Sequence, residues 1–141
     1  MKPSYAQRFA AALAVTALGL AASAARATDV PVQLSGDQEV PPVKTAATGS
    51  GMFAIAADNT IAGSITTKSV AGTAAHIHEG EAGKNGAVII PLTKGSNDTY
   101  SIPAGTKLSE SQMAAFKAGK LYVNVHSSAN PGGEIRAQLK P

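Results

Sequence analysis

The sequence contains no cysteine and no tryptophan, and only 4% of its 141 residues are aromatic. The absence of cysteine excludes disulfide bonds, thiolate metal sites, cysteine nucleophiles and a lipid-modified N-terminal cysteine. The aromatic side chains beyond residue 27 are Phe53, Tyr100, Phe116 and Tyr122. So few aromatic residues offer no platform on which nucleic-acid bases would stack.

The formal net charge of +3 at pH 7 originates in the first 27 residues. Three of the 12 basic residues, Lys2, Arg8 and Arg26, lie there, whereas all 9 acidic residues follow. The remaining chain therefore has nine charges of each sign and is neutral. A neutral chain lacks the positive field that attracts phosphates, so nucleic acid is excluded as a main partner.

Residues 1–27 have the pattern of a signal peptide. Basic residues accompany an apolar run from Phe9 to Ala22, and the segment ends in small residues just before Thr28. The run is interrupted by Thr16 and Gly19 and is shorter than the roughly 20 residues that a membrane span needs. We therefore expect a periplasmic or secreted protein that has no membrane span after cleavage.

Residues 28–141 are expected to form one all-β domain, because short β-branched stretches alternate with Gly, Asn, Asp and Pro. This spacing is typical of a Greek-key antiparallel β-sandwich or barrel. About eight strands are predicted: residues 30–34, 50–56, 61–68, 73–78, 87–92, 99–102, 121–126 and 134–139. Residues 87–92 are apolar at nearly every position, which indicates a strand covered on both faces or one that closes a barrel.

One short helix is predicted after Ser109. Ser109 and Gln112 form a capping-box pattern, and Leu108 with Met113 forms the accompanying hydrophobic staple. Gly119 is expected to end the helix. Met113 and Phe116 share one face, so the helix is predicted to cover a sheet edge or a barrel end.

The histidines carry the main functional signal. His76 and His78 lie two residues apart in one predicted strand and point to the same face, while Ile77 points to the core. In the strand 121–126 the same alternation puts His126 on the face away from the apolar residues. If the two strands pack in one sandwich, the three imidazoles meet outside the core.

Three imidazoles around one point favour zinc, copper or nickel, and the affinity series places Cu(II) above its neighbours. His76, His78 and His126 are therefore the candidate metal ligands, with copper the first choice. Glu79 and Glu81 are the carboxylates nearest in sequence and are candidates for supporting the ligands or for weak coordination, with Glu79 the first choice. The alternative is that these histidines are polar surface residues without a ligand.

The chain also resembles the CHRD (chordin) domain of exported bacterial proteins. The residues that carry the resemblance are Leu34–Val43, Thr45–Gly49, Ala75–His78 and Leu121–Arg136. The resemblance implies a β-rich extracytoplasmic module spanning residues 28–141. It also makes a metal-free interaction module that binds a protein or a polysaccharide plausible.

A fainter similarity connects the histidines with the sandwich of Cu/Zn superoxide dismutase. His76, His78 and His126 look like three of the copper ligands, and Arg136 is placed like the arginine that attracts the anionic substrate. The chain has no fourth histidine, no zinc cluster and no disulfide. The likeness implies copper binding with Arg136 nearby and leaves a copper redox enzyme as a third hypothesis. No catalytic residue is assigned, and a role in metal handling or sequestration ranks first.

Overall fold

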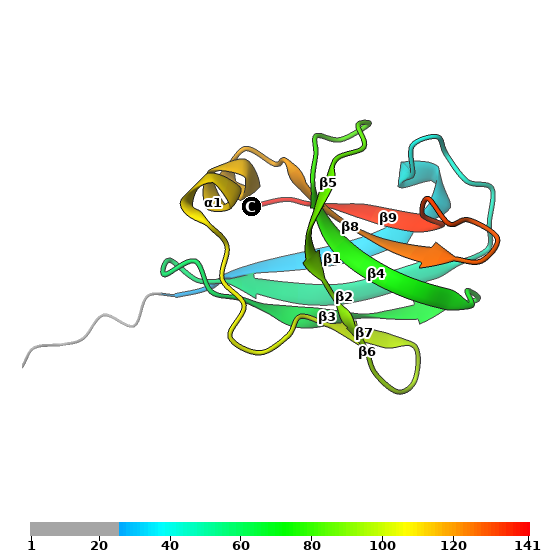
Figure 1. Ribbon diagram of the computed structural model, residues 1–141, viewed down its shortest axis with the longest axis horizontal. Helices are drawn as coiled ribbons and strands as arrows, with labels where there is room; N and C mark the ends of the chain where they lie inside the picture. Colours follow the sequence, from blue (N-terminus) through cyan, green and yellow to red (C-terminus); the bar gives the residue numbers. More distant parts are fainter. Residues whose placement is uncertain (1–25) are drawn as a thin grey trace, which may run out of the picture.

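The computed structural model describes residues 26–141, and the predicted signal peptide falls almost entirely outside them. Nine strands and one α-helix occur in this part of the chain (Figure 1). The elements are β1 (Thr28–Ser35), a 3-10 turn η1 (Gly36–Gln38), β2 (Thr48–Ile55), β3 (Ile61–Lys68), β4 (Gly72–Glu79), β5 (Ala87–Pro91), β6 (Thr93–Lys94), β7 (Thr99–Ser101), α1 (Glu110–Lys117), β8 (Leu121–Ser127) and β9 (Ile135–Leu139). No helix within these residues has both the length and the apolar character to cross a bilayer.

All nine strands belong to one antiparallel sheet that is nearly closed. Its order is β5-β4-β8-β9-β1-β2-β3-β7-β6, so β4 pairs with β8 and β9 leads on to β1. The two end strands β5 and β6 are consecutive in the chain, and the Leu92 amide donates to the carbonyl of Ala75 at 2.9 Å. The predicted all-β fold is confirmed, and the two-residue strand β6 is the one that sequence patterning missed.

The core lies inside this curved sheet. Alternate residues of each long strand point inward, as in β1, where Val30, Val32 and Leu34 are buried between exposed neighbours. In β8 the inward set is Leu121, Val123 and Val125. Tyr122 and Asn124 on the outer face of β8 are also buried, and the half-buried His126 lies on the same face.

Strand β5 is not covered on both faces. Ala87 is exposed and Val88 is 51% exposed, because β5 ends the sheet and pairs only with β4. That alternative of the sequence prediction is wrong. The β5–Leu92–β6 path joins the two ends of the sheet, which agrees with a strand that closes a barrel.

Helix α1 begins as its capping box predicts. The Gln112 amide donates to Ser109 Oγ at 3.1 Å, and the Ser109 amide donates to Gln112 Oε1 at 2.9 Å. Met113 and Phe116 are buried in the core. Gly119 follows the helix with φ +70, a left-handed conformation that glycine adopts without strain.

Glu134 connects Thr45, in the loop between η1 and β2, with Ser127 at the end of β8, the residue after His126. Thr45 Oγ1 donates to Glu134 Oε1 at 2.7 Å, and the Ser127 hydroxyl donates to the second carboxylate oxygen. The Glu134 side chain is buried. The hydrogen bond from Ser127, followed by that from Thr45, lowers the pKa of Glu134 below 4.5. The carboxylate form therefore stabilises the connection between residues 39–47 and the end of β8.

We predict that Glu134→Gln lowers the free energy of unfolding at pH 7 by about 1–3 kcal/mol, because two hydrogen bonds lose a charged acceptor. A pKa depressed by folding gives stability that is present above the unfolded value and is lost as the pH falls through the folded value. Urea denaturation from pH 7 to pH 3 should therefore show the difference between the two proteins shrinking below pH 4.5. Glu79→Gln, the same change on an exposed side chain, is the control; a constant Glu134→Gln difference would contradict the prediction.

Candidate metal centre

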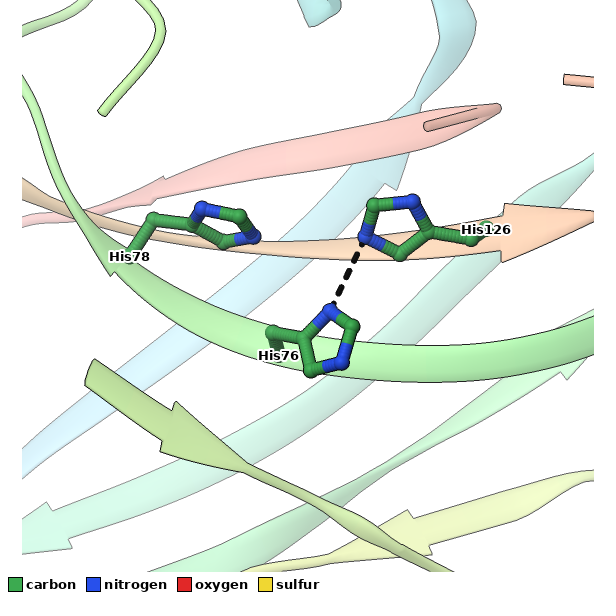
Figure 2. A group of neighbouring side chains, drawn as sticks. All are labelled: His76, His78 and His126. Atoms are coloured by element: carbon green, nitrogen blue, oxygen red, sulfur yellow. Dashed lines mark hydrogen bonds between the residues drawn. The ribbon is translucent and has the colours of Figure 1, made fainter. Parts of the chain in front are cut away.

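The register between β4 and β8 brings the three histidines together. His76 lies opposite Asn124, His78 opposite Tyr122, and His126 opposite Ala74. All three rings project from the outer face of the sheet toward one another, as Figure 2 shows. The centroid separations are 4.8 Å for His76–His126, 5.7 Å for His76–His78 and 6.1 Å for His78–His126. The structure therefore brings together the three rings that strand alternation singled out.

Backbone carbonyls determine the tautomers of two rings. His126 Nδ1 is 2.8 Å from the carbonyl oxygen of Pro131, and His78 Nδ1 is 3.0 Å from that of Gly86. Because a carbonyl oxygen only accepts, each Nδ1 carries the proton and donates it. In the neutral rings, Nε2 of His78 and Nε2 of His126 are therefore unprotonated, and each carries a free lone pair. This is how metal-binding histidines are generally oriented by their surroundings.

His76 completes the trio through its Nδ1, which lies 3.0 Å from His126 Nε2. Since His126 Nε2 is unprotonated, His76 Nδ1 carries the proton and donates a hydrogen bond to it. For His76 Nδ1 to serve as a ligand, its ring would have to carry the proton on Nε2 instead, with Nδ1 holding the ion together with the other two histidines. The donor atoms that face one another are thus His76 Nδ1, His78 Nε2 and His126 Nε2.

These side chains fit a transition-metal ion. One nitrogen from each of the three residues lies within 4.8 Å of the other two. An ion with bonds of about 2.0–2.1 Å holds its ligand nitrogens about 3.4 Å apart in tetrahedral geometry and at most about 4.2 Å apart. A movement of less than about 1 Å by each ring would bring the three nitrogens to the separations that a bound ion requires. Imidazole ligands suit zinc, copper and nickel alike.

Two of the imidazoles are biased toward the neutral form that binds metals. Burial lowers the pKa of His76, and the neighbouring His126 and His78 charges lower it further. Burial also lowers the pKa of His78, against the opposing effect of its hydrogen bond to Gly86. Both shifts favour the uncharged imidazole, in which His78 Nε2 has a free lone pair while His76 Nδ1 holds the proton shared with His126.

A stack of three side chains holds His78 in place. The His78 ring lies parallel to the Tyr122 ring, with centroids 4.7 Å apart and an interplanar angle of 6°. The Arg136 guanidinium lies over the same tyrosine, 3.4 Å from its centroid. The strand order β4-β8-β9 puts Tyr122 between the other two. Aromatic stacking and a cation–π contact together fix the His78 ring.

Arg136 also fastens the loop 80–86 over this stack. Its Nη2 donates to the carbonyls of Glu81 and Lys84 at 3.1 and 2.8 Å, and its Nη1 donates to Asn85 Oδ1 at 3.3 Å. The Arg136 side chain is 1% exposed. It touches the stack rather than open solvent, so a freely diffusing anion does not meet it directly.

Glu79 does not approach the three rings. Its side chain is exposed, and it pairs with Leu121, whose side chain faces the core. No hydrogen bond or ion pair joins it to a histidine within residues 26–141. Glu81 is also exposed and forms an ion pair with Lys120 at 3.1 Å. Proximity in sequence placed both carboxylates nearer to the site than the fold does.

Sequence reasoning missed two polar residues beside the site. Asn124 is 2% exposed and Glu39 is 4% exposed. Burial raises the pKa of Glu39, while the Arg136 charge and the Asn124 amide oppose that rise. The alternation of β8 would have identified Asn124, because it lies on the same face as His126. No local pattern marks Glu39, which reaches the site from the loop after η1.

The comparison with known families gives a clear result. The CHRD domain family matches residues 30–139 of the chain. The chain belongs to the CHRD domain family. The match confirms the resemblance carried by the segments around Glu39, His76 and His126. No curated protein and no solved structure matches the chain.

We predict that Arg136→Met loosens the loop 80–86, because three acceptors lose their common donor while the apolar stem is kept. Amide hydrogen exchange of residues 80–86 should accelerate, and the free energy of unfolding should fall by about 3 kcal/mol or more. The control is Lys120→Ala, which removes only the exposed ion pair to Glu81 and should cost about 1 kcal/mol or less. Unchanged exchange in Arg136→Met would contradict this role.

Proposed function

We propose that this CHRD domain protein binds a transition-metal ion, copper first, through His76, His78 and His126, and that it serves in metal handling or sequestration outside the cytoplasm. The supporting observation is the convergence of three imidazoles, in which the tautomers of His78 and His126 leave Nε2 lone pairs facing the trio and His76 Nδ1 donates to one of them. The Nδ1–H groups of His78 and His126 each donate to a backbone carbonyl, which keeps the Nε2 atom of each ring free. This arrangement prepares the rings for a cation.

Copper is preferred for two physical reasons. The affinity of nitrogen sites for divalent ions rises to Cu(II) and falls again at zinc. The ligand nitrogens are also unevenly spaced, from 3.0 Å between His76 and His126 up to 4.8 Å for the widest pair. A tetragonal Cu(II) ion has neighbouring ligands about 2.9 Å apart and opposite ligands about 4.1 Å apart, whereas a tetrahedral zinc site is even.

The test is isothermal titration of Cu(II) into the purified protein, and we expect one equivalent to bind. The double variant His76→Ala, His78→Ala should weaken binding by more than about 100-fold, since changes in outer partners alone cost 10- to 100-fold. The matched control is Ser64→Ala, Thr66→Ala, two positions equally spaced on β3. Equal affinity in the histidine variant and the control would reject the proposal.

The family supports a second candidate, an extracellular interaction module that binds a protein or a polysaccharide without metal. Its contact regions would be the end strand β5, where Val88 is exposed, and the exposed parts of the loop 80–86. This function predicts that no copper co-purifies with the protein. It also predicts that the histidine double variant keeps its partner, which distinguishes it from metal handling.

A further inference from the structure

Three buried side-chain atoms in the described part of the chain have no hydrogen-bond partner. They are Glu39 Oε1, His78 Nε2 and Asn124 Oδ1. His78 Nε2 is a lone pair because Nδ1 carries the proton, and an amide oxygen only accepts. Buried acceptors without donors are rare in folded proteins and indicate an unseen ion or water. Two of them, His78 Nε2 and Asn124 Oδ1, belong to side chains on the outer face shared by β4 and β8.

The fold determines where the Asn124 side chain lies. Asn124 is opposite His76 on one side and opposite Arg136 on the other, between Tyr122 and His126 along β8. It therefore occupies the middle of the outer face that carries the three imidazoles. His78 is two residues from His76 on the same face of β4, so Asn124 is its diagonal neighbour across the strand pair, a separation that side chains can reach across. The Asn124 side chain opposes the lowering of the His78 pKa by burial, which agrees with this placement.

Glu39 determines which end of the amide faces the histidines. A Cβ placed on Gly133 would lie 2.5 Å from Glu39 Oε1 and 2.6 Å from Asn124 Nδ2. Both atoms therefore crowd the same point, and Gly133, with φ +127, leaves room for them. With the NH₂ end beside the Glu39 carboxyl, the oxygen end of the amide is directed away from Glu39. His78 Nε2 and Asn124 Oδ1 are then two buried acceptor atoms on the same outer face of the sheet, and neither has a donor.

We propose that Asn124 Oδ1 is a fourth ligand of the metal ion, and that Glu39 is the positioning residue that turns the Asn124 amide so that this oxygen is presented. The inference rests on the proposed metal function and makes the donor set three nitrogens and one neutral oxygen. A cation satisfies both unpartnered acceptors at once. An amide oxygen is a hard donor, so its presence favours Cu(II) over Cu(I).

A proton or a water molecule could instead lie between His78 Nε2 and Asn124 Oδ1, and each can be distinguished from a metal ion. A proton on His78 Nε2 would bridge the two acceptors, but it would add a second positive charge to the buried stack that contains Arg136. A water molecule would donate to both acceptors. With either occupant, the Asn124 oxygen would not respond to metal binding.

The first experiment uses the unaltered protein and needs no variant. Zn(II), which is diamagnetic, is titrated while the side-chain amide and carboxamide carbon resonances of Asn124 are followed by NMR. Coordination through Oδ1 should shift both resonances in step with metal saturation. The side-chain amide of Asn59, which donates to Glu110 near α1, is the internal control and should not move.

The second experiment compares Cu(II) and Cu(I) affinities in variants whose folding is checked by thermal unfolding. Asn124→Leu should weaken Cu(II) binding by roughly 10- to 100-fold and Cu(I) binding less. Glu39→Gln should weaken Cu(II) binding by about 10-fold and reduce the zinc-dependent shift of Asn124. Glu79→Gln, the same charge change on an exposed side chain, should alter the affinity less than about 2-fold.

The outcomes separate this inference from the proposed function. If the protein binds Cu(II) through its histidines but the Asn124 resonances stay fixed under zinc, the fourth ligand is rejected and the three-histidine site stands. Equal Cu(II) affinities in Asn124→Leu and the unaltered protein would reject it in the same way. If the protein binds neither Cu(II) nor Zn(II), both proposals fail together.

Discussion

The pairing register of β4 with β8 is the constraint on which the candidate site depends. It sets His76 opposite Asn124 and His78 opposite Tyr122, so that the imidazole rings, the Asn124 amide and the Tyr122 phenol share one face. A slip of one residue would turn both histidines of β4 into the core and Ile77 outward. The apolar set Ala75, Ile77, Val123 and Val125, all fully buried, resists that slip. Core packing thus determines the relative positions of the three histidines indirectly.

Two loops contribute the hydrogen-bond acceptors that orient the imidazole rings of His78 and His126. The carbonyls of Gly86 and Pro131 belong to loops, yet they decide which nitrogen of His78 and His126 is free. The loop around Gly86 is in turn fastened by Arg136, and the Gly86 amide donates to the Tyr122 hydroxyl at 3.1 Å. A change in the loop 80–86 would therefore affect the tautomer of His78. Arg136 acts in this arrangement by holding backbone carbonyls.

Sequence reasoning succeeded where the information is local. The period of two along β4 and β8 predicted the shared face of the three histidines, and the capping box of Ser109 predicted the start of α1. Closeness in sequence was a poor guide for Glu79, because the same local alternation turns it to the face opposite His78. Sequence reasoning failed where position depends on distant packing. Glu39 is 39 residues distant from His78 and reaches the site only because η1 and the following loop fold over β9.

Charge balance gives Glu39 a further significance. The trio of neutral imidazoles provides no negative charge, while the buried Arg136 already contributes a positive one. A divalent ion placed there would be opposed by Arg136 through a medium of low polarity, where charges interact more strongly than in water. Two buried carboxylates occur in residues 26–141, and Glu134 is already engaged with Ser127 and Thr45. Glu39 is the one that interacts with the Arg136 charge, so in the proposed site a single loop carboxyl would both orient the Asn124 amide and offset the cost of bringing a cation in.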